Sequence, residues 1–333
     1  MNNSRGKIRA VARAAAARLS GRRVPLSVAF ITTYRCNFTC EYCDIWRLRE
    51  EDLSTRDALG MIDEFSSMGM QSLSFTGGEP LMRDDLGELI SHASGRGVNT
   101  VVFTNGSLVE KSIRSLRGLT TLVVSLDGPP GVHDRLRMEG TYGDVVAGIR
   151  AARRAGLRVL TNTVLTRENL DHIPWIVDEA ARLGVGMMFQ PVLPYPFSSI
   201  EARIGAIAPK APAYAEALRK LRELKRKKRH IVNSSEYLSH ISIPAWERNS
   251  RKCLAGRLYC AVTPAGEVAP CYTVFGSRNW PSGLDLGFGS AFREIGDFSC
   301  NGCYSSLAES DFLYSLRPGP LLRAVVSGMP WVS

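Results

Sequence analysis

Residues 26–43 read LSVAFITTYRCNFTCEYC. The first half of this stretch is largely apolar, which is typical of a strand in a parallel sheet that helices cover on both faces. Three cysteines follow at C-x3-C-x2-C spacing, Cys36, Cys40 and Cys43, with no fourth cysteine nearby. Because thiolates are the natural ligands of iron–sulfur clusters, the spacing predicts a 4Fe–4S cluster with one iron left open. A zinc site completed by a distant ligand is the alternative.

A short apolar run followed by an amphipathic helix recurs from residue 26 to residue 190. The first helix of the series is expected between Ser54, a typical N-cap, and Gly69, a typical helix end. The expected strands cover residues 26–32, 71–75, 98–103, 121–126, 157–165 and 185–190. Six strand–helix units of this kind predict an α/β fold, a partial (β/α)6 TIM-like barrel.

Polar and glycine-rich residues stand where the later strands are expected to end. In chain order they are Gly77, Gly78, Glu79, Pro80, Asn105, Ser125, Asn162 and Gln190. In a barrel of parallel strands the C-terminal strand ends share one edge, where active sites lie. We therefore expect these residues to gather beside the cysteine loop. Taken singly, each has a plainer explanation as a turn or a helix cap.

The cysteine loop, with the aromatic Tyr42 just before the third cysteine, resembles the signature of the radical S-adenosylmethionine (radical SAM) superfamily. The resemblance extends over residues 26–190 and includes the order of the strand-end motifs. It implies two cofactors, a 4Fe–4S cluster on the three cysteines and S-adenosylmethionine (SAM) on its open iron. It also implies an enzyme that cleaves SAM reductively to a 5′-deoxyadenosyl radical, which takes hydrogen from an unactivated C–H bond.

The same resemblance implies which residues meet SAM. The element Gly77-Gly78-Glu79-Pro80 would bind the SAM ammonium through backbone carbonyls and the Glu79 carboxylate. Ser125 stands where the family binds the ribose. Arg137 would pair with the SAM carboxylate, a bidentate task that suits a guanidinium. The remaining pocket residues would be Tyr42, Asn105, Asn162 and Gln190.

A second group of cysteines lies in the C-terminal segment: Cys253, Cys271, Cys300 and Cys303. Their spacing around Gly266, an expected hairpin turn, resembles the twitch and SPASM extensions of radical SAM proteins. The four thiols are too few for two further clusters, so the resemblance implies the shorter twitch type with one auxiliary 4Fe–4S cluster. Full ligation would indicate electron transfer, and partial ligation would indicate direct substrate binding. A four-cysteine zinc knuckle is the structural alternative.

Cys260 is left over by this assignment. Three interpretations stay open: a small buried apolar residue, a catalytic thiol that donates hydrogen to a substrate radical, or a ligand that replaces Cys253.

Charge and composition divide the chain further. Residues 1–25 hold seven of the basic residues and no acid, in a chain of 333 residues with net charge +10. We expect a basic N-terminal helix over 1–25, the radical SAM barrel over 26–230, and a twitch-like domain with a C-terminal helix over 231–333. No apolar run is long enough to span a membrane, and grouped cysteines favour metal binding in a reducing compartment. A cytoplasmic location is predicted, with peripheral membrane contact through the basic helix as an alternative.

The substrate is the least constrained prediction. We expect a small molecule or a lipid, changed by dehydrogenation, epimerisation or bond formation. A maturase of ribosomally made peptides is the alternative, although only about 25 residues precede the barrel. That short segment also predicts no cobalamin domain. The one-electron reductant would be an external flavodoxin or ferredoxin. A non-catalytic iron–sulfur or zinc protein is the rival class.

Overall fold

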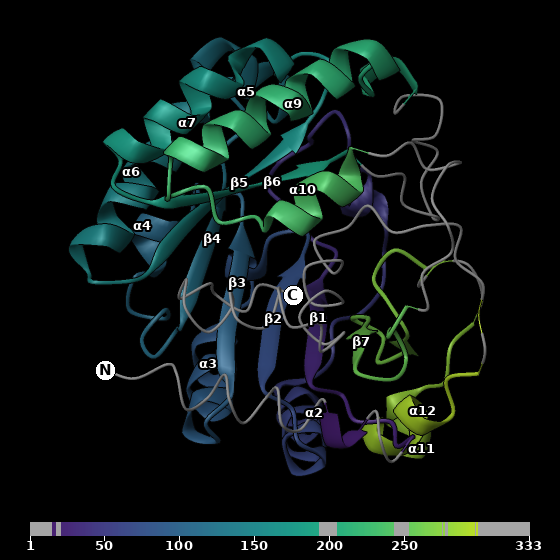
Figure 1. The fold of residues 1–333 in the computed structure, drawn as a ribbon. Coiled ribbons are helices and arrows are strands. Elements are labelled where there is room, and N and C mark those ends of the chain that lie inside the picture. The colour runs from purple at the N-terminus through teal and green to yellow at the C-terminus, as the bar shows by residue number, and fades with distance from the viewer. Residues whose placement is uncertain are drawn as a thin grey trace.

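The structure is a computed structural model, and it describes residues 15–17, 21–192, 205–242, 253–274, 276, 279–296 and 298. Its centre is a curved, mostly parallel sheet (Figure 1). The first six strands are β1 (Ser27–Thr33), β2 (Ser72–Gly77), β3 (Asn99–Thr104), β4 (Thr121–Ser125), β5 (Val159–Leu165) and β6 (Gly186–Pro191). All six lie within about two residues of the runs that the sequence predicts, because those runs are almost continuously apolar.

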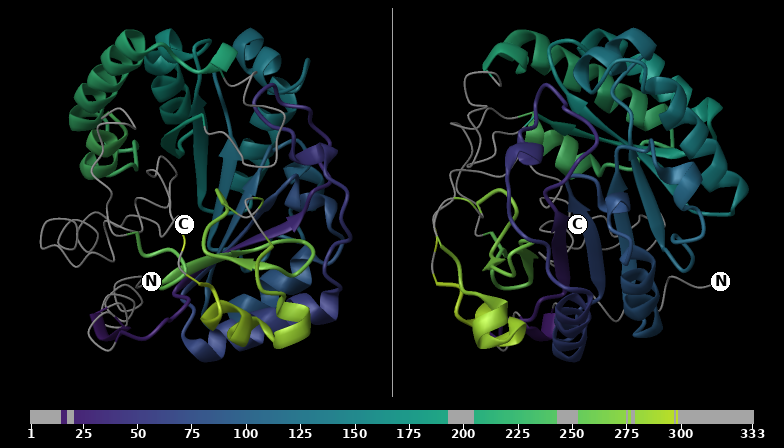
Figure 2. Two further views of the ribbon diagram at one scale, coloured as in Figure 1. Left: turned by 90° about the vertical axis from the view of Figure 1, so that its right-hand side faces the viewer. Right: turned by 180° about the vertical axis from the view of Figure 1, so that it is seen from behind.

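The strands lie in the order β6-β5-β4-β3-β2-β1-β7-β8, so the sheet is open between β6 and β8. Neighbours from β1 to β6 pair in parallel, for example Phe30 with Phe75 between β1 and β2. Figure 2 shows the curvature from two further sides. The predicted α/β fold, a partial TIM-like barrel of six strand–helix units, is therefore confirmed.

Helices connect the strands and cover the sheet. They are α2 (Thr55–Met68), α3 (Leu86–Gly95), α4 (Val109–Ser112), α5 (Pro130–Leu136), α6 (Tyr142–Arg154) and α7 (Ile173–Arg182), with short 3-10 turns η1 (Ile45–Arg47), η2 (Pro80–Met82) and η3 (Leu170–His172). The predicted ends of α2 are confirmed. The Ser54 side chain accepts a hydrogen bond from the Asp57 amide, and Gly69 ends the helix with a φ of 110°.

Alternate residues of the strands serve two different purposes. Val28 and Phe30 of β1 belong to the main hydrophobic core, which they share with Phe65 of α2. Strand residues of the opposite face, such as Ser125 and Asn162, reach a pocket instead. The alternation follows from the two-residue period of a strand, and it separates the residues that stabilise the fold from those available for chemistry.

The C-terminal part of the chain continues the same sheet. Its elements are α9 (Ala211–Lys227), α10 (Ser235–Ile241), β7 (Tyr259–Val262), β8 (Val268–Ala269), α11 (Gly283–Leu286) and α12 (Phe288–Arg293). Strand β7 pairs in parallel with β1, and β8 forms an antiparallel hairpin with β7. Helix α12 packs on α2, where the rings of Phe288 and Phe292 lie 6.2 and 6.3 Å from that of Phe65. Strands from both sides of residue 230 thus belong to one sheet. The division of the chain into two domains at that residue stays a prediction.

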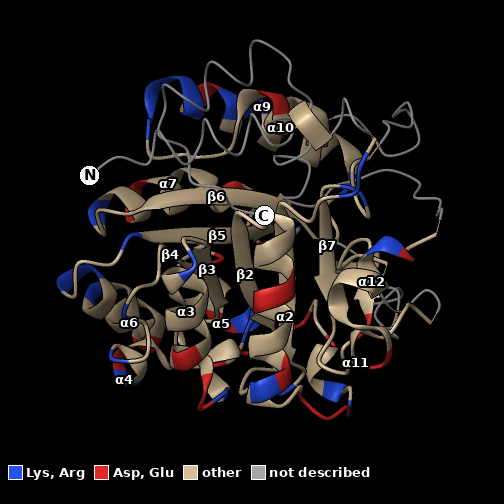
Figure 3. Ribbon diagram, turned by 90° about the horizontal axis from the view of Figure 1, so that it is seen from below, with Lys and Arg blue, Asp and Glu red and all other residues tan. Residues whose placement is uncertain are grey.

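Charged residues of both signs follow one another along α9 (Figure 3). Arg219 pairs with Glu216 and Glu223, and Lys228 at the helix end pairs with Asp178, 3.0 Å away. The basic run at the end of this helix is therefore partly neutralised within the protein. No helix in the described ranges is long and apolar enough to cross a bilayer.

Candidate active site

The C-terminal ends of the barrel strands surround one pocket. Its wall combines the cysteine loop after β1 with residues from β2, β3, β4, β5 and β6, as the parallel arrangement requires. The predicted residues that line it are Cys36, Cys40, Tyr42, Cys43, Gly77, Gly78, Asn105, Ser125, Arg137, Asn162 and Gln190. Phe103, Val164 and Val192 add apolar surface. The strand-end residues that the sequence singles out thus meet beside the cysteine triplet.

The three cysteines of the loop are free thiols on the pocket wall. Burial raises the pKa of Cys36 to about 11 and that of Cys43 to about 12, so without a metal these thiols hold their protons at neutral pH. Among the described side chains, no three His, Cys, Asp or Glu converge as they would around a single metal ion. Three thiols on one wall suit a multi-iron cluster.

One buried polar atom of the pocket lacks a hydrogen-bond partner within the described part of the chain. The Oδ1 atom of Asn162 is buried and has no hydrogen-bond partner among the described residues, although Asn162 lines the pocket. Buried polar groups are almost always satisfied in native proteins, so a polar molecule in the pocket is expected to supply the partner. The donor set and this unsatisfied carbonyl oxygen both fit a cluster with SAM beside it.

Gly77 and Gly78 let the end of β2 approach the cysteine loop. The Gly78 amide donates to the Thr33 carbonyl at 2.8 Å, and the Glu79 amide donates to the Arg35 carbonyl at 2.9 Å. A Cβ atom on Gly78 would lie 2.1 Å from the Arg35 carbonyl oxygen, and Gly77 has a φ of 124°. Only glycine fits either position. The pair therefore determines where the loop sits, besides lining the pocket.

The Glu79 side chain is held by hydrogen-bond donors from neighbouring segments. It is fully buried and accepts hydrogen bonds from the Thr104 hydroxyl (2.8 Å), the Asn105 amide (2.7 Å) and the Leu81 amide. Burial raises its pKa to about 7, against the lowering effect of these donors. It is not among the residues that line the pocket, and the contact of its carboxylate with the SAM ammonium stays a prediction. Its neighbour Pro80 is buried as well and begins η2.

Arg137 is held in the pocket wall by Asp127, a residue that the sequence analysis did not assign. The Arg137 Nε donates to Asp127 Oδ2 at 2.7 Å, and the Tyr42 hydroxyl donates to the same oxygen at 2.5 Å. The Val164 amide donates to the other carboxylate oxygen at 2.8 Å. Asp127 thereby joins the cysteine loop, β4 and β5. Its signal in the sequence is its place two residues after Ser125, at a strand end.

Asn105 connects the pocket to the cysteine loop. Its amide nitrogen donates to Asn37 Oδ1 at 2.8 Å, and its Oδ1 accepts from the backbone and hydroxyl of Ser107. The Asn37 side chain in turn donates to the Ser107 hydroxyl at 2.9 Å. This closed set of hydrogen bonds orients Asn105 and leaves it little freedom to reach further than the pocket rim.

Cys260 lies elsewhere. It is buried on β7 in register with Val28 of β1, and both belong to the main hydrophobic core. Burial raises the pKa of its thiol. It faces the core side of the sheet and is not among the residues that line the pocket, and its predicted catalytic role, hydrogen donation to a substrate radical, stays a prediction. The interpretation as a small buried residue agrees with this environment.

Two of the four expected auxiliary ligands can be located. Cys253 and Cys271 lie in one hydrophobic cluster with Leu26 and Tyr259, beside the start of β1. The Cys253 sulfur is 2.9 Å from the Tyr259 hydroxyl, and the Cys271 sulfur is 3.1 Å from the Thr273 hydroxyl. Cys300 and Cys303 lie outside the described residues. The assignment of these four cysteines to one cluster stays a prediction.

Comparison with known proteins identifies the family. Residues 30–180 match the model of the radical SAM superfamily. An AdoMet-dependent heme synthase of Methanosarcina barkeri is 30% identical over 277 residues, which cover 74% of this chain and 76% of that protein. The chain belongs to the radical SAM superfamily. Its membership assigns it a 4Fe–4S cluster and SAM as cofactors, and the family implication drawn from the cysteine loop is confirmed.

Two further similarities extend beyond the barrel. Mycofactocin maturase MftC of Mycolicibacterium smegmatis is 25% identical over 328 residues, 93% of this chain and 81% of that protein. The structure of Streptococcus suis SuiB bound to S-adenosylmethionine superposes with a TM-score of 0.65 at 16% identity. That match covers 80% of this chain and 64% of SuiB, and at this identity it shows a shared fold.

Proposed function

We propose that this chain takes a hydrogen atom from an unactivated carbon of a small organic or lipid substrate, after reductive cleavage of SAM in the pocket. When bound, the cluster supplies one electron to the SAM sulfonium, which separates methionine from a 5′-deoxyadenosyl radical. An external flavodoxin- or ferredoxin-type protein would provide that electron. The observation that carries the proposal is the meeting of the three loop thiols with strand-end residues from β2 to β6 in one pocket.

The protein's own residues bind and orient the cofactors. Cys36, Cys40 and Cys43 would hold the cluster, and the backbone of Gly77 and Gly78 would face the amino group of SAM. Arg137, kept in the wall by Asp127, would pair with the SAM carboxylate. The ribose and adenine would be met by Ser125, Asn162 and Gln190, where Asn162 Oδ1 still lacks a partner. Apolar side chains around the rim exclude water, which protects a reactive carbon radical.

The substrate class is supported by similarity alone. Relatives that match about three quarters of this chain are named heme synthases, and their product is a small molecule. The alternative, a peptide substrate, is supported by the mycofactocin maturase, which matches nearly the whole chain, and by peptide cyclases at 25–28% identity. Either substrate would lose its hydrogen atom at the same pocket.

One experiment tests the proposal and separates the two substrates. The protein is reconstituted anaerobically with iron, sulfide, SAM and dithionite, and deuterated cell extract is added with or without prior protease treatment. We expect deuterium in 5′-deoxyadenosine with both extracts, because a small molecule or lipid resists proteolysis. Loss of the deuterium after proteolysis would favour the peptide. SAM cleavage without deuterium from any extract fraction would contradict hydrogen abstraction from a cellular substrate.

A further inference from the structure

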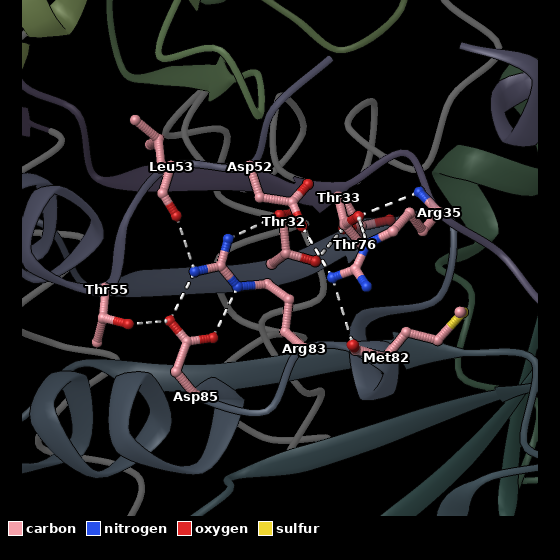
Figure 4. Close-up of polar contacts among 10 residues, drawn as sticks. All are labelled: Thr32, Thr33, Arg35, Asp52, Leu53, Thr55, Thr76, Met82, Arg83 and Asp85. Atoms are coloured by element: carbon pink, nitrogen blue, oxygen red, sulfur yellow. Dashed lines mark hydrogen bonds and ion pairs between the residues drawn. The ribbon is translucent and has the colours of Figure 1, made fainter. Parts of the chain in front are cut away.

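A buried guanidinium lies beneath the cysteine loop, outside the pocket. The side chain of Arg83, which directly follows η2, is only 5% exposed. Its Nε and Nη2 donate to the two carboxylate oxygens of Asp85 at 2.8 and 2.6 Å. Its Nη1 donates to the Thr32 carbonyl and its Nη2 to the Leu53 carbonyl, both at 3.0 Å. Figure 4 shows these four bonds radiating from one side chain.

The two carbonyls that Arg83 binds flank the cysteine loop. Thr32 lies near the end of β1, just before the loop, and Leu53 is the last buried residue before α2. Between them run residues 33–52, which contain all three cysteines and whose only helical turn is η1. A segment with so little regular structure depends on tertiary contacts for a fixed position, and those at its two ends add to the contacts of Arg35, Asn37 and Tyr42 within it. Arg83 joins those two ends to each other.

Neighbouring contacts reinforce the same closure. Thr55, at the start of α2, donates to Asp85 at 2.8 Å and so fixes the carboxylate that orients Arg83. On the outer side, Arg35 pairs with Asp52 at 3.0 Å and donates to the Met82 carbonyl at 3.4 Å. The Arg35 side chain is 59% exposed, so this second pair is screened by water and contributes less. Of the two arginines that connect the ends of the loop, Arg83 is the buried one (Figure 4).

We propose that Arg83 is a positioning residue for SAM cleavage: it closes the base of the cysteine loop and thereby holds the three thiols against the pocket wall. The inference rests on the proposed function, since it takes Cys36, Cys40 and Cys43 as the cluster ligands. A guanidinium is needed because two carbonyls and a carboxylate must be bound at once in one plane. A lysine at this position keeps the charge but cannot make all four bonds.

The test compares four full-length proteins: wild type, Arg83→Lys, Asp85→Asn, and Arg182→Gln as a control for loss of an arginine–carboxylate pair elsewhere. Arg182 makes a similar two-pronged pair with Glu179 on α7, away from the loop. The first readout is the alkylation rate of Cys40 in iron-free protein, followed by mass spectrometry. Cys260 serves as an internal reference, because it is buried in the core and reacts only when the whole fold opens. The second readout is the EPR spectrum of the reduced, reconstituted protein during a SAM titration.

In Arg83→Lys we expect Cys40 to react about tenfold faster or more, with Cys260 unchanged, because at least one charge-assisted bond at the loop base is lost. The SAM-induced EPR change should need about tenfold more SAM. Asp85→Asn should shift both readouts in the same direction by less, and Arg182→Gln should match wild type.

Equal acceleration of Cys40 and Cys260 in Arg83→Lys would overturn the proposal, because Arg83 would then serve general stability only. Wild-type values in both readouts would overturn it as well. If Arg83→Lys does not fold, Asp85→Asn decides by the same two readouts, since it loosens Arg83 without removing it. A wild-type protein with no SAM-induced EPR change would contradict the proposed function instead. The alkylation rates of Cys40 and Cys260 would still test whether Arg83 holds the cysteine loop in place.

Discussion

At the scale of single residues, the edge of the pocket depends on two buried carboxylates, each of which accepts several hydrogen bonds. Glu79 and Asp127 are both completely buried, and each accepts bonds from residues on neighbouring strands or loops. They differ in their partners. Asp127 faces the cation of Arg137, whereas Glu79 meets only neutral hydroxyl and amide donors. The two carboxylates should therefore respond differently to substitution.

The pH dependence of stability should reveal Glu79. Burial raises its pKa from 4.5 to about 7, so the folded protein binds this proton more tightly than the unfolded chain. Its contribution is then fully present below about pH 4.5 and is lost as pH rises towards 7, which amounts to about 3 kcal/mol. Denaturant unfolding from pH 4.5 to 7.5 would measure it. Relative to Glu79→Gln, the wild type should lose stability over that range; a constant difference between them would contradict the assignment.

Asp127→Asn should be costly in a different way. The substitution leaves the Arg137 guanidinium buried without its counter-charge, which costs about 3 kcal/mol in the free energy of unfolding. Because Arg137 is proposed to meet the SAM carboxylate, SAM affinity should also fall, by about tenfold. Asp63→Asn is the control, since Asp63 pairs with His92 and Arg96 at the surface and should cost less than about 1 kcal/mol. Similar losses in the two variants would refute the role of Asp127.

At the scale of elements, the end of β2 and the cysteine loop fit together through backbone alone. Gly78 has the Arg35 and Tyr34 carbonyls so close that no side chain can be added. Two backbone hydrogen bonds fasten the contact. The position of the cysteine loop therefore depends on the absence of a side chain at Gly78 as well as on the cysteines themselves.

Gly78→Ala should displace the loop. The new methyl group would meet backbone within 2.1 Å, so either β2 or the loop must move, and we expect a loss of about 2 kcal/mol or more together with weaker cluster binding. Gly60→Ala is the matched control, because Gly60 lies in α2 with open space around it and should stabilise the helix by about 0.5–1 kcal/mol. Iron content and thermal unfolding of both variants check this. Normal iron content in Gly78→Ala would contradict it.

The elements themselves could be predicted well from the sequence, because strands covered on both faces carry apolar runs that are hard to mistake. That Ser125 and Asn162 lie in one pocket could be predicted, because the carboxyl ends of parallel strands share one edge of the sheet. The contacts of Asp127 and Arg83 could not, since they join residues up to 85 positions apart through side-chain geometry. Likewise the apolar sequence of β7 indicates a strand, but its pairing with β1 depends on tertiary packing.

At the scale of the whole molecule, the C-terminal elements and the barrel share one sheet and one core. Strand β7 extends the sheet beside β1, and α12 covers α2 through aromatic rings. Continuous packing of this kind predicts that both parts unfold together. The arrangement also brings Cys253 and Cys271 beside the first residues of β1, while the pocket lies past its last residues.

Phe292→Ala tests that coupling. Phe292 is fully buried and its removal from the contact with Phe65 should cost about 3–5 kcal/mol. We expect a single, shifted unfolding transition in circular dichroism, because the barrel and the C-terminal elements lose one common core. Leu284→Ala, at a half-exposed position of α11, should shift it little. Two separate transitions in Phe292→Ala would show that the parts are independent.

We propose that the thiols of Cys36, Cys40 and Cys43 hold the cluster at which SAM is cleaved. The most direct measurement is 5′-deoxyadenosine formed by reconstituted, reduced protein in which all three are replaced by alanine, beside wild type and Cys260→Ala. Since only these three line the pocket among the described cysteines, the triple variant should form none, and Cys260→Ala should cleave SAM at close to the wild-type rate. Formation of 5′-deoxyadenosine by the triple variant would contradict the assignment of these three thiols as the cluster ligands.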